Sequence, residues 1–182
     1  MTARFRVSQC MSGKQQGFTL IELIMVIILL GVLSAVGIGL LPSSDQYTAR
    51  LAADKWLTFF RLGQRMALIK QNASDLVTLT VSQNANQWQA SLLQGSDLLQ
   101  ESEFDREEVD LKFSTSDFSS ACSALASVSF PQTFYFDGNG DHVTVARAAI
   151  NSNVRICLVG GGQQQELCLS PSGYIYSNTC VP

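Results

Sequence analysis

The apolar and polar positions divide the chain into three stretches with different periods. An apolar run without a charged residue extends from Leu23 to Leu41, and Ser34 is its one polar interruption. At about 1.5 Å per residue, a helix of this run is about 28 Å long, close to the ~30 Å hydrocarbon core of a bilayer. The run therefore predicts one membrane-spanning helix.

A second helix is predicted from about residue 45 to residue 72, where apolar residues recur at helical spacings. Pro42 ends the apolar run, and Ser43, Ser44 and Asp45 offer an N-cap for the new helix. The stripe expected to be buried comprises Ala49, Ala53, Trp56, Leu57, Phe60, Ala67 and Leu68. This pattern predicts one buried helix face whose aromatic residues belong to the core.

From residue 76 to residue 182 the pattern changes to the alternation that is typical of strands. Strands are expected at 76–81, 88–93, 109–113, 133–136, 143–145, 154–158, 166–169 and 174–176. The acidic stretch from Glu101 to Asp110 is expected to be a solvated loop. One long helix followed by short strands predicts an α+β domain, in which antiparallel sheet packs on the apolar stripe of the helix.

Composition and charge narrow the function classes. A chain of 182 residues with 46% hydrophobic content suits one globular domain with an appendage. The net charge of −3 provides no broad basic field for nucleic acid, and the basic residues Lys112, Arg147 and Arg155 are scattered through the globular part. We therefore expect no specific nucleic-acid partner.

The residues before the apolar run predict its orientation. Arg4, Arg6 and Lys14 precede it without an acidic residue among them, which favours a cytoplasmic N-terminus and an exported domain. A secretory signal peptide is the competing interpretation, but the run is longer than a usual signal core and Glu22 stands near its start. A carboxylate beside a membrane-spanning run needs a partner or a place at the interface.

The residues around that carboxylate form a recognisable motif. A leader with the basic residue Lys14 ends in Gly17, Phe18 follows, and Glu22 stands four positions after Phe18. This arrangement resembles the class III signal of type IV prepilins and type II secretion pseudopilins. The resemblance implies that a prepilin peptidase cuts after Gly17 and methylates the new amine of Phe18. It also implies that Glu22 pairs with the amine of an adjacent subunit in the filament core.

The same resemblance divides the chain into three parts. Residues 1–17 form the leader, residues 18–41 the transmembrane and filament-core helix, and residues 42–182 a periplasmic domain with the pilin fold. The implied location is the inner membrane in a single pass, and afterwards a pilus or pseudopilus. The implied partners are other pilin or pseudopilin subunits, the prepilin peptidase, the inner-membrane assembly platform and the membrane itself.

Features of the globular part favour a subgroup. Phe136 to Gly138, a later strand with Arg155, Leu167 to Leu169 and the pair Gly173-Tyr174 are similar to the C-terminal half of pseudopilin H and FimT-like minor pilins. Arg65 to Ile69 on the preceding helix also suits that group. The cysteine-containing C-terminus resembles minor pilins of the mannose-sensitive haemagglutinin pilus.

The function implied is that of a minor type IV pilin, a structural subunit that takes part in pilus assembly and initiation. One alternative is a type II secretion pseudopilin that drives protein export, and a less favoured one is a minor pilin for DNA uptake. An enzyme is not expected, because the chain lacks a GxSxG elbow and His142 has no evident nucleophile partner. No cofactor is predicted.

The cysteines predict disulfides. Removal of a leader that contains Cys10 leaves four, which form two bonds in an oxidising compartment, with three connectivities to choose from. Cys157 and Cys168 flank a Gly-rich turn between two strands expected to pair, which makes a bond between them plausible. Cys122 would then bond to Cys180 by elimination. Without a CxxC pair, no metal site is predicted.

A short acidic stretch from Asp137 to Asp141 has oxygen side chains at alternate positions, as the start of a calcium loop does. His142 replaces the glycine that an EF-hand loop needs, and Ala148 replaces its glutamate. A hairpin turn rich in Gly and Asn is therefore the favoured interpretation, and calcium binding the alternative.

Overall fold

The computed structural model describes residues 18–38, 45–70, 75–106 and 109–182. The chain divides into two compact units, residues 1–42 and residues 43–182. In the first unit the described residues form helix α1, Leu20–Ile38. The predicted N-cap residues Ser43 and Ser44 lie outside the described residues.

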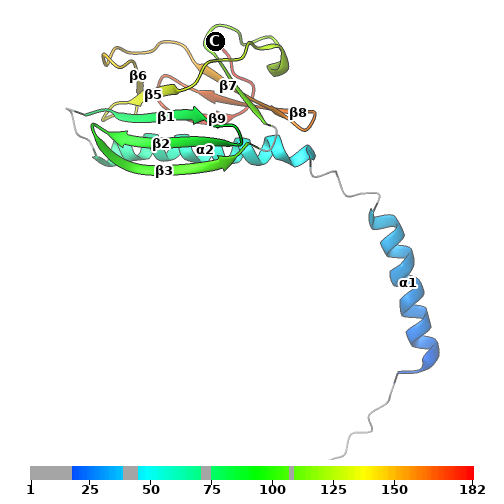
Figure 1. The fold of residues 1–182 in the computed structure, drawn as a ribbon. Helices are drawn as coiled ribbons and strands as arrows, with labels where there is room; N and C mark the ends of the chain where they lie inside the picture. Colours follow the sequence, from blue (N-terminus) through cyan, green and yellow to red (C-terminus); the bar gives the residue numbers. More distant parts are fainter. Residues whose placement is uncertain (1–17, 39–44, 71–74, 107–108) are drawn as a thin grey trace, which may run out of the picture. The chain divides into compact units, whose positions relative to one another are not determined.

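The second unit contains helix α2, Asp45–Lys70, and two antiparallel sheets (Figure 1). The first sheet has the strand order β3-β2-β1-β5-β6, and the second the order β4-β7-β8-β9. The strands of the first sheet are β1 Val77–Gln83, β2 Gln87–Gln94, β3 Asp97–Asp105, β5 Gln132–Phe136 and β6 His142–Val143. The strands of the second sheet are β4 Asp110–Ser114, β7 Val154–Gly160, β8 Gln163–Leu169 and β9 Ile175–Ser177.

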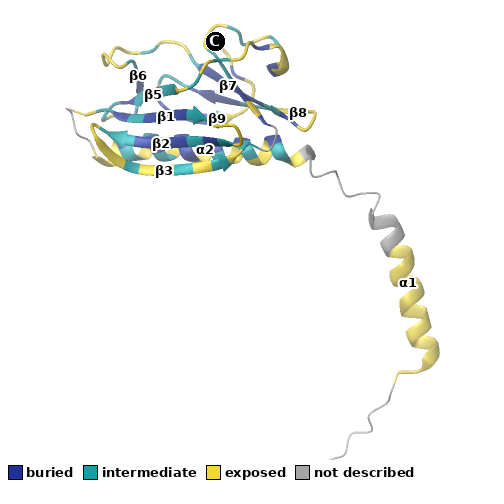
Figure 2. Cartoon of the chain, in the orientation of Figure 1, coloured by how far each residue is buried: buried dark blue, intermediate teal, exposed yellow. Residues whose placement is uncertain are grey.

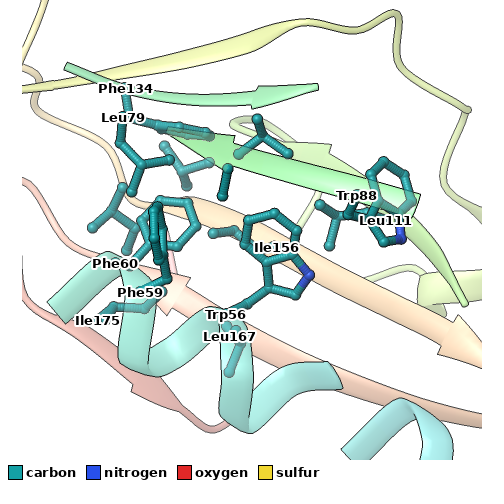
Figure 3. Close-up of a cluster of buried hydrophobic side chains, with 14 of the residues drawn as sticks. Trp56, Phe59, Phe60, Leu79, Trp88, Leu111, Phe134, Ile156, Leu167 and Ile175 are labelled. Atoms are coloured by element: carbon teal, nitrogen blue, oxygen red, sulfur yellow. The ribbon is translucent and has the colours of Figure 1, made fainter. Parts of the chain in front are cut away.

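Helix α2 packs against strands of both sheets, and the main hydrophobic core of the unit lies between them. Figure 3 shows Trp56 and Phe60 of the helix among side chains from the strands, including Leu79 and Ile156. The two sheets and the helix confirm the predicted α+β class with antiparallel sheet on the helix.

The buried stripe of α2 agrees with the sequence in most positions. Ala49, Ala53, Trp56, Phe60 and Ala67 are buried as predicted. Leu57 is partly buried against the core, and Phe59, which the pattern did not single out, is buried. The prediction for Leu68 is wrong, because its side chain is 43% exposed. Ala67 beside it is buried, so Leu68 lies at the border of the buried face of the helix.

A glycine on the same helix sets the distance to the first sheet. A Cβ atom at Gly63 would lie 3.1 Å from Leu92 Cδ2 and 3.3 Å from Phe136 Cε2. The absent side chain therefore allows the helix backbone to approach the leucine and phenylalanine side chains of β2 and β5 closely.

Alternation in the inner strands produces the core face of the first sheet. Val77, Leu79 and Val81 of β1 are buried at every second position, and β2 repeats this pattern in register. The prediction of a loop for the acidic stretch from Glu101 to Asp110 is wrong for residues 101–105, which belong to β3. This strand is an edge strand with mostly exposed side chains (Figure 2), so it lacks the apolar alternation that marks a strand in sequence.

Strand β7 is buried on both faces, which places it between two layers. Ile156 and Leu158 point into the core with α2, whereas Arg155 and Cys157 lie on the opposite, outer face. Part of that outer face is covered by the segment that contains the short helix η1, Cys122–Ala124.

Candidate functional site

The start of α1 carries the residues on which the processing motif depends. Phe18 and Thr19 precede the helix, and the Thr19 carbonyl accepts hydrogen bonds from the backbone N–H groups of Glu22 (3.1 Å) and Leu23 (3.2 Å). Thr19 Oγ1 also accepts from the Glu22 N–H at 3.3 Å, which is the contact of an N-cap residue. Glu22 therefore lies in the first turn, where the helix dipole favours a negative charge.

From Leu20 to Leu33 the surface of α1 is apolar on all sides apart from Glu22. Every side chain from Phe18 to Leu33 is exposed, and Glu22 is the charged residue among them. Phe18 is 86% exposed and Leu33 is 67% exposed. A helix with no polar face gains stability only when lipid or other protein covers it.

Two predictions about this region reach beyond the described residues. Gly17, the predicted cleavage site, lies outside them, and so do residues 39–41 of the predicted transmembrane run. None of the helices in the described part of the chain is both long enough and apolar enough to cross a membrane.

A second polar cluster lies on the outer face of the second sheet. Arg155 Nη2 donates to Glu166 Oε2 at 2.9 Å, and Arg155 Nη1 donates to the carbonyls of Ser120 (2.8 Å) and Asp117 (3.3 Å). The other carboxylate oxygen of Glu166 accepts a short hydrogen bond from the Cys180 N–H. One ion pair therefore connects two adjacent strands, the covering segment and the C-terminal residues. We name it the Arg155–Glu166 clasp.

The clasp also affects a neighbouring carboxylate. Hydrogen bonds from the Ser120 backbone, then its side chain, and from the Ser119 backbone lower the pKa of Asp117, with a smaller contribution from the charge of Arg155. The loop carbonyls that bind Arg155 thus belong to a tight turn around Asp117. This turn fixes the position at which the guanidinium donates.

The structure pairs the four cysteines differently from the sequence expectation. Cys122 is bonded to Cys157, and Cys168 is bonded to Cys180, with Cα–Cα distances of 5.5 Å and 5.1 Å. The expected bonds from Cys157 to Cys168 and from Cys122 to Cys180 are therefore wrong. The reason is the register of β7 and β8, in which Cys157 lies opposite Glu166 and Cys168 lies opposite Arg155. The two cysteines are thus diagonal neighbours, and each bonds to a cysteine from another segment.

The Asp137 to Asp141 stretch forms the turn between β5 and β6. Asp137 Oδ1 accepts from the backbone N–H groups of Asn139 (2.9 Å) and Asp141 (3.0 Å). The Asp137 N–H in turn donates to the Asp141 carbonyl at 3.0 Å, and Gly140 has a φ of 80°. These contacts confirm the hairpin turn that the sequence favoured.

His142 follows this turn and is buried, with 5% of its surface exposed. Its ring lies beside Phe134 and Phe136, with centroid distances of 5.9 Å and 6.1 Å. Burial lowers the pKa of His142 to about 4, so the ring is neutral at physiological pH. The sequence pattern placed this residue on a turn, whereas in the structure it begins strand β6 and is buried.

Among the described residues, Cys122, Cys157 and Glu166 form the one group of potential metal ligands that lie close enough to share an ion. The two sulfur atoms are bonded to each other, so neither offers a thiolate. Their arrangement belongs to the disulfide and the clasp.

Two of the three basic residues considered for nucleic acid, Lys112 and Arg155, are engaged inside the domain, whereas Arg147 is exposed. Arg155 is 4% exposed, and Lys112 Nζ donates to the carbonyls of Ser123 (2.9 Å) and Leu125 (2.7 Å). The clasp was not predicted from the sequence, although a charged residue within the apolar strand Val154 to Leu158 was a visible signal. A charge at such a position is retained only with a buried partner.

The N-terminal part of the chain matches a known family model. Residues 12–38 match the prokaryotic N-terminal methylation motif, a stretch that includes Gly17, Phe18 and the whole of α1. The match fits the superfamily of prepilins and pseudopilins, whose motif implies a membrane-anchored, pilin-like structural protein. Neither the curated proteins nor the solved structures compared with the chain gave a match.

Proposed function

We propose that the chain is a minor type IV pilin, anchored in the inner membrane by residues 18–41 and built into a filament as a structural subunit. The observation that carries this proposal is the methylation motif at residues 12–38, which coincides with a helix whose described side chains are exposed and apolar around a single carboxylate.

Exposure of α1 supports a function in which this helix exchanges lipid for protein contacts. Burial of apolar surface contributes about 25 cal/mol per Å², so a helix exposed on all sides has a strong tendency to be covered. Lipid and other apolar helices cover this surface equally well as far as the hydrophobic effect is concerned. Close packing therefore determines whether α1 associates with another helix. The space beside Gly31 is open within 4 Å of its Cβ position, which allows a second helix backbone to approach there.

The charge at the start of α1 gives this packing a direction. Cleavage after Gly17 would leave a cationic amine on Phe18, next to the positive end of the α1 dipole. Glu22, one turn into the helix, is the carboxylate that can compensate it. Within lipid or a filament core both charges need a partner, so pairing between neighbouring subunits would fix their register along the filament.

The globular unit supports an exported position for residues 43–182. Its two disulfides are stable in an oxidising compartment such as the periplasm. The covering segment and the C-terminal residues are both bonded to the second sheet, so the unit is suited to remain folded outside the cell.

Gene deletion with complementation tests the proposal. Surface pili, release of exported proteins and DNA uptake are scored together in strains that carry the unchanged chain, Glu22→Ala or Met25→Ala. We expect pili to be lost on deletion and with Glu22→Ala, and restored with Met25→Ala, which shortens an exposed side chain of the same helix without removing a charge. Intact pili with failed protein release would instead favour a secretion pseudopilin.

A further inference from the structure

A groove lies between α2 and the edge strand β3. Its apolar lining comes from Phe59 and Leu62 of the helix and from Phe104 of the strand, and its polar lining includes Thr58, Gln100 and Ser102. The space measures about 440 Å³. We name it the α2–β3 groove; Figure 1 shows the two elements side by side.

The wall of this groove that β3 provides is packed against the core. The Phe104 ring packs edge-on against Trp56 with a centroid distance of 4.9 Å, and against Phe59 at 6.0 Å. Both partners are buried core residues of α2. The groove is therefore a preformed feature supported by the core.

Strand β3 ends the first sheet. It pairs with β2 along one side, and in the described part of the chain no strand pairs with its other side. An edge strand presents alternating N–H and C=O groups to an added strand. The strand Asp97–Asp105 is the longest of the two sheets, so it offers an extended template.

Side chains of β3 alternate between the groove and the opposite face. Gln100, Ser102 and Phe104 line the groove. Glu101, Glu103 and Asp105 occupy the alternate positions and are exposed, which places three carboxylates on the other face of the strand. A strand added to this edge would meet an apolar groove with one set of side chains and a row of negative charges with the other.

We propose that β3 and the α2–β3 groove bind an extended segment of a partner protein in which apolar side chains alternate with lysine or arginine. The segment extends the first sheet by one strand, its apolar side chains enter the groove, and its basic side chains lie opposite Glu101, Glu103 and Asp105. Cross-strand pairs of opposite charge stabilise such an arrangement, whereas like charges destabilise it.

The charge of β3 also argues against a second copy of this chain as the partner. Pairing of β3 with β3 of a second copy would bring two rows of carboxylates together. Protection of an exposed edge by charge alone would account for the acidic residues but not for the apolar groove beside them. The combination of a groove and a charged edge is what specifies a basic, amphipathic partner strand.

Binding of designed peptides to the full chain in lipid nanodiscs tests the proposal. The probe is an end-blocked peptide of alternating valine and lysine, and the control peptide has glutamate in place of lysine. We expect the lysine peptide to bind and to slow amide hydrogen exchange in residues 97–105, and the glutamate peptide to do neither. Equal binding of the two peptides, or no protection of β3 by the lysine peptide, would overturn the proposal.

Two variants locate the site. Glu103→Gln with Asp105→Asn should weaken binding roughly fivefold. Asn151→Lys with Ser152→Lys, which changes the net charge by the same amount in an exposed loop, should leave binding unchanged. Thr58→Trp fills the groove from an exposed helix position and should abolish binding while the circular dichroism spectrum is retained. If both charge variants weakened binding equally, the peptide would be attracted by net charge alone, and the proposed site at β3 would be contradicted.

Discussion

The guanidinium of Arg155 lies 2.9 Å from the carboxylate of Glu166, with side-chain exposures of 5% and 17%. The pair connects β7 to β8 and lies beside both disulfides, since Cys157 is opposite Glu166 and Cys168 is opposite Arg155 in the register. The same two side chains bind the loop at Ser120 and the backbone of Cys180. Segments distant in sequence are therefore anchored to one buried charge pair.

Removal of one partner of this pair should destabilise the domain strongly. Glu166→Leu leaves a buried guanidinium without its counter-charge, and we expect the free energy of unfolding to fall by about 3 kcal/mol. The double variant Arg155→Met with Glu166→Leu should be more stable than Glu166→Leu alone, because no charge remains buried. Denaturant titrations followed by tryptophan fluorescence measure both, since Trp56 and Trp88 lie in the core.

The exposed ion pair between Arg106 and Asp110 serves as the control. Its side chains are 31% and 59% exposed, so Asp110→Asn should cost less than about 1 kcal/mol. If Asp110→Asn and Glu166→Leu lowered the free energy of unfolding equally, burial of the clasp would make no contribution to stability.

The two disulfides should contribute unequally to stability. The Cys122–Cys157 bond closes a separation of 35 residues and the Cys168–Cys180 bond one of 12. Restriction of the unfolded chain then predicts losses of about 4 and about 3 kcal/mol when each pair is replaced by alanine. Peptide mapping under non-reducing conditions should recover these two linkages, and a peptide that joins Cys157 to Cys168 would contradict the structure.

Acid should destabilise the domain through its single histidine. Burial lowers the pKa of His142 to about 4 in the folded state, against about 6.5 in the unfolded chain. Between these values the unfolded chain binds a proton that the folded chain does not, so stability is present above about pH 6.5 and is lost as the pH falls towards 4. The full loss from this group is about 3 kcal/mol.

Replacement of the ring isolates this effect from the carboxylates. His142→Phe should remove the part of the pH dependence between pH 6.5 and 4 that the histidine contributes, and denaturant titrations across that range measure the difference. Parallel stability curves for the two proteins would contradict a buried, neutral histidine.

The carboxylate of Glu22 should be required for assembly of subunits but not for folding of the globular unit. Glu22→Ala should leave the stability of the globular unit unchanged, because Glu22 belongs to the other compact unit. It should, however, reduce crosslinking between α1 helices of neighbouring subunits in the envelope by at least about tenfold, the factor that corresponds to 1.4 kcal/mol. A variant that crosslinks as the unchanged chain does would argue against the ion pair between subunits.

Local periodicity predicted the helices and most strands, because burial on one face leaves a repeat in the sequence. Ala53, Trp56 and Phe60 follow such a repeat, and so do Leu79 and Val81. Strand β3 was not predicted. It is held by backbone hydrogen bonds to β2, and its side chains are mostly exposed, so its sequence has no alternation of apolar residues. Leu68 was misplaced because periodicity alone does not show where the buried face of the helix ends.

The disulfide pairing and the clasp required three-dimensional register. Cys157 and Cys168 were placed correctly on adjacent strands, but an offset of two positions decides whether their side chains meet. Likewise, Arg155 was visible as a charge in an apolar strand, whereas its partner Glu166 was identified only by the pairing of β7 with β8. Contacts between segments distant in sequence carry no local signal.

Mass spectrometry of the mature N-terminus, on protein isolated from the cell envelope, tests the central claim most directly. The proposed processing predicts a chain that begins at Phe18 with a methylated amine and contains Glu22 intact. A chain that retains residues 1–17, or that begins at a later position inside or after α1, would contradict it.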